Sequence, residues 1–327
     1  MRLALKLAAL GVALLAGGTV LVERQAAARE AQAEADFPPE GQMITVNGTQ
    51  VHVLIRGSGP DLVLLHGASG NLRDFSFGLI DQLADRYRVI AFDRPGLGYT
   101  GRTDPAYDSA FSSQAETLSE QATLLQAAAA QLGAERPLVM GQSYGGSVAL
   151  AWALDHPDHI AGLVLVSAPS NEWEGGLGPL YAINASVIGG AFILPLISAF
   201  APVRQVRTTL DSIFAPNPVP PGYDAHIGAE LVIRRGSLRA NVRQVAALKS
   251  ELAMLVPRYG TLTLPVEIVH GDSDTLVPLK VHSAKLVNQI PGAVLTVLPG
   301  VGHMPHHSDP QAVIDAIDRA AARAGLR

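Results

Sequence analysis

The sequence alternates short apolar runs with segments of helical spacing, and this alternation limits the possible folds more than any other feature. The runs that predict buried strands are Leu62–Leu65, Val89–Phe92, Leu138–Met140, Leu163–Val166, Val266–His270 and Val294–Leu298. Continuous apolar runs of this length are typical of strands covered on both faces. Because strands that alternate with helices pair in parallel, we predict an α/β fold with a doubly wound, mostly parallel sheet.

Two regions depart from this alternation. Met43–Val46 and Val51–Arg56 flank Asn47-Gly48, a dipeptide that favours a tight hairpin turn. The alternation then lapses between about Pro169 and Leu264. This lapse predicts a helical cap at residues 169–264, inserted before the strand Val266–His270. The predicted core then consists of residues 41–168 and 265–327.

The predicted cap contains an uncharged stretch from Gly175 to Val203. Its length alone admits a membrane span. Pro179 and Pro195 make a straight lipid-facing helix unfavourable, because proline removes a helical hydrogen bond. We therefore expect packed or interfacial helices in this stretch.

The N-terminus carries the features of an export segment. Arg2 and Lys6 precede an apolar run that ends at Val22, which predicts a signal anchor or a cleaved signal peptide at residues 1–22. The polar, Ala/Glu-rich residues 23–40 are expected to form a tether. These features predict a protein anchored in the inner membrane and facing the periplasm, or exported after signal cleavage.

Composition excludes several classes of function. The formal net charge is −5, so nucleic acid is not an expected partner. The chain contains no cysteine, so it has neither disulfides nor thiolate metal sites. Hydrophobic residues make up 48% of the chain and charged residues 16%, which favours a large packed core over disorder.

The pentapeptide Gly141-Gln142-Ser143-Tyr144-Gly145 is the strongest chemical signal. It fits Gly-x-Ser-x-Gly and lies between a predicted strand and a predicted helix. In that context the sharp strand-to-helix turn exposes the serine hydroxyl above the sheet. Ser143 is therefore the predicted nucleophile.

A serine hydroxyl needs a histidine base that a carboxylate orients. Asp272 and Asp274 follow one predicted strand, and His303 follows the next. The carboxyl ends of parallel strands are where such sheets place their sites. We predict Asp274 as the acid and His303 as the base, with Asp272 holding the turn and serving as the reserve candidate.

Other histidines compete for a role. His306 and His307 lie near His303, and a metal site formed by these three is the alternative interpretation. We favour one catalytic histidine beside polar loop residues, with no metal and no organic cofactor. The remaining histidines that we considered are expected in helices or surface turns and exposed to solvent: His156, His159, His226 and His282.

Backbone N–H groups should stabilise the oxyanion of the tetrahedral intermediate. The residue after the nucleophile, Tyr144, is one predicted donor. Ala68, in the loop that follows Leu62–Leu65, is the other. Gly67 and Gly70 of that loop are equally well explained as turn glycines.

Together these motifs resemble the α/β-hydrolase superfamily, in its capped esterase, C–C hydrolase and haloperoxidase-like branch. The segments that carry the resemblance are His66-Gly67, Asp93–Gly98, Gly141–Gly146, Gly271–Asp274 with Val277-Pro278, and Gly302-His303. The resemblance covers about Gly41 to Ala322 apart from the cap. It implies that Asp93–Gly98 is a structural turn shaping the pocket floor. Gln142 departs from the pattern, since many relatives carry His there.

The expected activity is hydrolysis of a carboxylic ester, one with an apolar group, through an acyl-enzyme. The predicted partners are a small-molecule ester and, through the N-terminal segment, a membrane. Cleavage of C–C or amide bonds by the same triad is an alternative. A non-catalytic, membrane-anchored binding or accessory protein is a second one.

Overall fold

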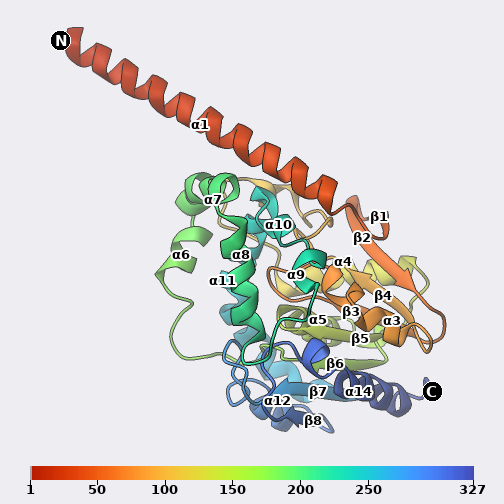
Figure 1. Cartoon of the computed structure of the whole chain (residues 1–327). Helices are drawn as coiled ribbons and strands as arrows, with labels where there is room; N and C mark the ends of the chain where they lie inside the picture. The colour runs from red at the N-terminus through yellow and green to blue at the C-terminus, as the bar shows by residue number, and fades with distance from the viewer. Residues whose placement is uncertain (1) are drawn as a thin grey trace.

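The computed structural model describes residues 2–327, with the backbone alone at residues 2–16, 180, 203, 206 and 207. Within these residues eight strands form one sheet in the order β1-β2-β4-β3-β5-β6-β7-β8 (Figure 1). They are β1 (Gln42–Val46), β2 (Thr49–Arg56), β3 (Asp61–Leu65), β4 (Arg88–Phe92), β5 (Leu138–Gln142), β6 (Gly162–Val166), β7 (Val266–Gly271) and β8 (Val294–Leu298). The β1–β2 hairpin is antiparallel, β2 joins β4 antiparallel, and the other pairs are parallel. The predicted fold class is confirmed.

Helices cover both faces of the sheet. The core helices are α2 (Arg73–Ser76), α3 (Leu79–Leu83), α4 (Leu118–Gln131), α5 (Tyr144–Asp155), α12 (Ser283–Gln289), α13 (Pro305–Ser308) and α14 (Pro310–Arg323), with short 3₁₀ turns η1 (Pro105–Asp108) and η2 (Pro157–His159). Side chains of α4 and α5 pack in one hydrophobic cluster with one face of the sheet, and those of α3 and α14 pack in another with the opposite face. Burial on both faces explains why the central strands are continuously apolar.

Helix α4 begins at Leu118, whereas the apolar spacing predicts a start near Ser113. Thr117 caps the helix, because its hydroxyl accepts a hydrogen bond from the backbone N–H of Glu120. The Glu120 carboxylate in turn accepts one from the Thr117 backbone N–H at 2.7 Å. This capping box fixes the helix start, and spacing alone does not reveal it.

The segment between β6 and β7 forms a helical cap. It comprises α6 (Pro179–Ala185), a π-helical turn η3 (Gly189–Ile193), α7 (Leu194–Phe200), α8 (Val203–Phe214), α9 (Tyr223–His226), α10 (Ala229–Val232), α11 (Arg235–Leu255) and the 3₁₀ turn η4 (Val256–Thr261). Leu248, Leu252 and Leu255 of α11 are buried in the same cluster as α4 and α5. The cap is therefore packed firmly on the core along α11.

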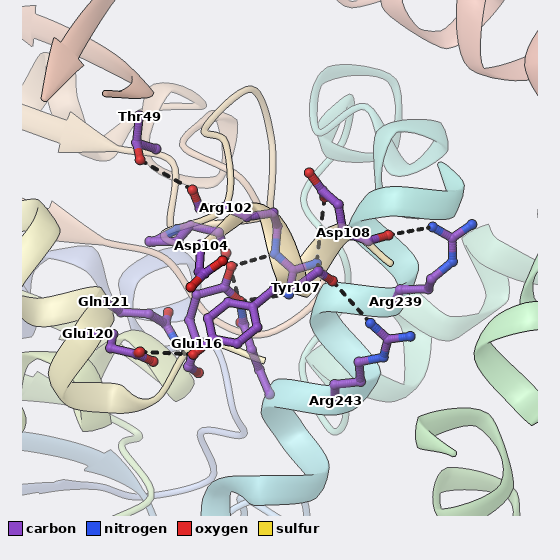
Figure 2. Close-up of polar contacts among 12 residues, drawn as sticks. Thr49, Arg102, Asp104, Tyr107, Asp108, Glu116, Glu120, Gln121, Arg239 and Arg243 are labelled. Carbon is purple, nitrogen blue, oxygen red and sulfur yellow. Dashed lines mark hydrogen bonds and ion pairs between the residues drawn. The ribbon is translucent and has the colours of Figure 1, made fainter. Parts of the chain in front are cut away.

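Arginines of α11 tie the cap to the loop around η1 (Figure 2). The Arg243 guanidinium donates to the carbonyls of Tyr107 and Ser109, at 3.1 Å each. In the same junction, Arg102 forms an ion pair with Glu116, and both side chains are buried. This junction holds the cap to the core.

The first helix, α1 (Arg2–Asp36), differs from the expected tether. Its N-terminal part projects from the body, and its C-terminal part lies against the cap (Figure 1). Ala26 and Ala33 are buried, and the Glu30 carboxylate lies 2.7 Å from the Arg235 guanidinium. Ala and Glu favour helix formation, and the ion pair docks the helix on α11. Residues 23–36 are therefore a docked helix.

No helix among the described residues is long and apolar enough to cross a membrane. The predicted export segment at residues 1–22 lies largely outside the described side chains, which begin at residue 17. The signal or anchor therefore stays a prediction.

Candidate active site

Ser143 occupies the sharp turn between β5 and α5. Its backbone has φ 50° and ψ −125°, a strained conformation for a residue with a side chain. A Cβ at Gly141 would lie 2.2 Å from the carbonyl oxygen of Gly145, and one at Gly145 would lie 2.1 Å from that of Leu65. Both flanking positions therefore require glycine, because another part of the backbone lies where a side chain would begin.

The structure brings the three predicted triad residues together. The Ser143 Oγ lies 2.9 Å from His303 Nε2, and His303 Nδ1 lies 2.7 Å from Asp274 Oδ2. An ionised carboxylate only accepts hydrogen bonds, so Nδ1 carries the proton and donates it to Asp274. His303 Nε2 is then free to accept the Ser143 proton, as a general base must.

Asp274 is held in its ionised form. Burial acts to raise its pKa, but hydrogen bonds from His270 and His303 outweigh burial and lower the pKa. Its Oδ1 also accepts the backbone N–H groups of Leu276 and Val277, at 2.9 Å each. The carboxylate is thus fixed in place on every side.

His270, at the end of β7, was not predicted to take part in the site. Its Nε2 lies 2.7 Å from the carbonyl oxygen of Val277 and 3.3 Å from Asp274 Oδ2, and its Nδ1 lies 2.6 Å from Ser283 Oγ. His270 therefore braces the loop that carries the acid. Its position as the last strand residue before Gly271-Asp272 was the only available signal.

Asp272, the reserve acid, holds the turn. Its Oδ1 accepts the Gly300 backbone N–H at 2.8 Å and the Ser273 hydroxyl at 3.0 Å. This position links the loop after β7 to the turn after β8. The structure brings Asp274, and not Asp272, to His303.

The two histidines that follow His303 face a different carboxylate. His306 Nε2 lies 3.0 Å from Asp74 Oδ2, and His307 Nε2 lies 2.8 Å from Asp74 Oδ1. The ligand atoms of these three residues lie within 4.8 Å of one another. A metal-bound histidine normally donates its second N–H to a partner, but His306 Nδ1 is buried without one. The donor set fits a hydrogen-bonded cluster better than a metal site, and the alternative interpretation, a site formed by His303 with His306 and His307, is not what these residues form.

The loop of the predicted oxyanion hole is held from behind by Asp93 and Arg94. Asp93 Oδ1 accepts the Leu72 backbone N–H at 2.7 Å, and the Arg94 guanidinium donates to the Gly67 carbonyl at 3.1 Å. Ala68, between these contacts, lines the same pocket as Ser143 and Tyr144. The Asp93–Gly98 turn supports this loop, and none of its residues is among the described residues that line the pocket.

A pocket of about 570 Å³ opens above Ser143. Apolar side chains make up most of its wall: Trp173, Leu177, Val245, Leu248, Leu276, Val277 and Val281. Charged residues, Glu172, Glu174 and Lys285, also line it. The pocket thus combines an apolar wall with a few charged groups.

His282 also lines the pocket, and the expectation that it is solvated was wrong. Its side chain is buried, and its Nδ1 accepts the backbone N–H groups of Ser170 and Asn171 at 3.2 and 3.3 Å. Burial lowers its pKa to about 4. His282 is therefore neutral at pH 7, with its proton on Nε2.

Gln142, the departure from the family pattern, lies beneath the base. Its Nε2 donates to the His303 carbonyl at 3.3 Å. A Cβ at Gly67 would lie 2.4 Å from its Oε1. Gln142 thus fills the space between the base and the oxyanion loop.

Known proteins share this sequence pattern and fold. A pimeloyl-[acyl-carrier protein] methyl ester esterase of Aeromonas hydrophila is 30% identical over 276 residues, covering 80% of this chain and 95% of the relative. A 2-hydroxy-6-oxononadienedioate/2-hydroxy-6-oxononatrienedioate hydrolase of Cupriavidus pinatubonensis is 26% identical over 262 residues, covering 78% of this chain and 81% of the relative. The crystal structure of a membrane phospholipase A shares the fold with a TM-score of 0.62 and 19% identity, covering 98% of this chain and 99% of that one.

The family profile of the alpha/beta hydrolases matches residues 62–316. This range runs from β3, before the oxyanion loop, into α14. It contains Ser143, Asp274 and His303. The chain therefore belongs to the alpha/beta hydrolase family.

Proposed function

We propose that this chain is a serine esterase that cleaves a carboxylic ester through an acyl-enzyme. The observation that carries the proposal is the 2.9 Å contact between Ser143 Oγ and His303 Nε2 at the base of a pocket with an apolar wall. Similarity to a methyl ester esterase supports the class of reaction.

The mechanism follows from the geometry. Ser143 Oγ attacks the ester carbonyl carbon while its proton passes to His303 Nε2. Asp274 stabilises the imidazolium, and the Ala68 and Tyr144 N–H groups bind the oxyanion. The tetrahedral intermediate collapses as His303 returns the proton to the departing alkoxide. Water, deprotonated by His303, then attacks the acyl-enzyme and releases the acid.

The substrate that fits best has an apolar group next to the scissile ester. Burial of apolar surface contributes about 0.8 kcal/mol per CH₂ group, so a longer chain gains affinity until the pocket is full. We therefore expect kcat/KM to rise from acetyl to medium-chain p-nitrophenyl esters. The experiment uses the full chain, because α1 packs on the cap. It measures this series in mild detergent.

The Ser143→Ala variant is the matched control for that series. It removes one oxygen and should lower kcat by about 10⁴-fold or more, with an unchanged melting temperature. Ester turnover that survives the substitution would contradict the proposal. Absence of turnover of both esters and C–C substrates in the folded wild type would favour the non-catalytic binding or accessory alternatives.

C–C bond hydrolysis is the second candidate. Similarity to the Cupriavidus hydrolase favours it, since the same triad residues can serve both reactions. Turnover of a vinylogous 1,5-diketone, with none of the p-nitrophenyl esters, would select this reaction. Turnover of esters alone would exclude it.

We further propose that the protein works at a membrane, anchored on the periplasmic side or exported. The support is an exposed apolar face on the cap, where Ile188, Phe192 and Phe200 are 68%, 62% and 54% exposed. α1 packs on α7 beside this face, and its Leu21 is 63% exposed. Exposed apolar side chains of this size on neighbouring elements are typical of interaction sites.

Vesicle sedimentation tests this localisation. The full chain should sediment with phosphatidylglycerol-containing vesicles, and the double variant Ile188→Glu/Phe192→Glu should bind at least about tenfold more weakly. Asn288→Ala is the control. It changes an exposed polar side chain of α12, at the end of the molecule away from α7 (Figure 1). Equal binding by all three proteins would remove the cap face from the proposal.

A further inference from the structure

The segment that joins α8 to α9, residues 215–222, is rich in proline. It contains Pro216, Pro218, Pro220 and Pro221, and we call it the strap. Proline fixes φ near −65° and leaves few alternative backbone conformations. The strap is therefore a stiff element of the cap, and the strap with its flanking residues Phe214 and Tyr223 contacts the segment around His303 on both sides.

The first contact lies immediately before the base. Asn217 accepts the Gly302 backbone N–H at 2.8 Å and donates its amide N–H to the Gly300 carbonyl at 3.2 Å. The strap also touches this loop directly, since a Cβ at Gly302 would lie 2.2 Å from the Ala215 carbonyl oxygen. One cap side chain thus spans the turn whose next residue is His303.

The second contact lies immediately after the base. The Tyr223 hydroxyl, at the end of the strap, donates to Asp74 Oδ1 at 2.7 Å. His306 and His307 reach the same carboxylate, and the side chains of Asp74, His306 and His307 are at most 5% exposed. Phe214, at the other end of the strap, packs its ring 5.6 Å from that of His307.

We propose that the strap positions the catalytic base. Asn217 fixes residues 300–302, and Tyr223 fixes residues 306 and 307 through Asp74, so the His303 backbone is held at both ends by the cap. This holds His303 Nε2 at the Ser143 hydroxyl. The inference rests on the proposed function, because it assigns Asn217 a positioning role in that same reaction.

A positioning role for Asn217 and an ordinary packing role lead to different kinetic effects. A purely structural contact would change stability or substrate affinity. A positioning contact changes the proton-transfer step, because a displacement of about 1 Å between reacting groups can cost about 100-fold in rate. kcat and the reactivity of Ser143 should therefore fall while KM and the melting temperature hold.

The test compares three variants of the full chain. Asn217→Ala removes both bonds to the loop, Asn217→Asp keeps the acceptor for the Gly302 N–H, and Asn288→Ala removes an exposed asparagine side chain that bonds only within its own helix. We expect kcat and the rate of Ser143 labelling by a fluorophosphonate to fall about tenfold in Asn217→Ala. Asn217→Asp should stay within about threefold of wild type, and Asn288→Ala should be unchanged.

Three outcomes overturn the inference. They are unchanged kcat and labelling in Asn217→Ala, a loss in KM or melting temperature alone, and an Asn217→Asp variant as slow as Asn217→Ala. Tyr223→Phe provides an independent measurement at the other end of the strap, with an expected loss in kcat of about threefold.

Failure of the proposed function would look different. In that case the folded wild type would not turn over esters, whether or not Ser143 is labelled. The strap can still be tested then, because the His303 Nδ1–H donated to Asp274 should give a downfield proton NMR resonance. Asn217→Ala should shift or broaden that resonance, and an unchanged resonance would overturn the inference.

Discussion

Two histidine–aspartate clusters draw on histidines that lie within four residues of each other in the chain, and the clusters have different surroundings. In the first, Asp274 holds His303 at 2.7 Å. In the second, Asp74 holds His306 at 3.0 Å and His307 at 2.8 Å. The residue types and distances are nearly the same, so neither explains why we assign chemistry to only one cluster.

The difference lies in what the second imidazole nitrogen meets. His303 Nε2 meets the Ser143 hydroxyl, which lines a pocket of about 570 Å³. His306 Nδ1 is buried and meets no hydrogen-bond partner. An imidazole held by a carboxylate becomes a general base only where its other nitrogen faces a proton donor that substrate can reach. The second cluster lacks that donor and links α2, α13 and the cap.

The largest expected effect is the difference in kcat between substitutions of His303 and of His307. His303→Ala should lower kcat by about 10³-fold or more, because it removes the group that takes the Ser143 proton. His307→Ala should lower kcat by less than about tenfold. Steady-state kinetics on one p-nitrophenyl ester compares them, and equal losses would show that the two clusters act as one unit.

Substitution of the two carboxylates should affect different quantities: kcat for Asp274 and the free energy of unfolding for Asp74. Asp274→Asn should lower kcat by about 10²- to 10⁴-fold, because it favours the wrong imidazole tautomer. Asp74→Asn should instead lower the free energy of unfolding by about 3 kcal/mol, since it places an amide N–H₂ against buried donors. Urea unfolding beside kinetics checks both. An Asp74→Asn variant of normal stability but without activity would contradict the distinction.

The smallest expected effect is a change in how stability depends on pH. Burial lowers the pKa of His306 below its ordinary value, so the unfolded chain takes up a proton near pH 6.5 before the folded chain does. Stability should therefore fall as pH drops from 7 to 5. The Asp74 carboxylate stays ionised across this window, because interactions with His306 and His307 outweigh the effect of burial and lower its pKa well below the ordinary value.

His306→Phe removes this proton uptake. The loss of unfolding free energy between pH 7 and pH 5 should become smaller by about 1 kcal/mol, whatever the variant's stability at pH 7. His159→Gln changes an exposed histidine and is the control. A wild-type slope retained in His306→Phe would mean that this side chain does not supply the proton uptake.

The elements that carry chemistry were the most predictable from sequence. Continuous apolar strands, Gly-x-Ser-x-Gly and the order serine, acid, histidine depend on local backbone requirements, and the structure places Ser143, Asp274 and His303 together. Gly141 shows why, since the backbone of Gly145, four residues further along, excludes any side chain there.

Contacts between distant segments were not predictable in the same way. His270 and Asn217 act on the base from 33 and 86 residues away in the chain, and no local pattern marks either one. Residues 23–36 were expected to be a tether because their composition is polar. Their ion pairs are formed with Arg234 and Arg235 of the cap, some 200 residues further along.

Covalent labelling of the nucleophile tests the central claim most directly. The folded full chain is treated with a fluorophosphonate, and the adduct is located by mass spectrometry of peptides. The account predicts one adduct, on Ser143, which is absent in Ser143→Ala and forms much more slowly in His303→Ala but at near-normal rate in His307→Ala. Ester turnover without labelling of Ser143, or labelling that is equally fast in His303→Ala, would contradict it.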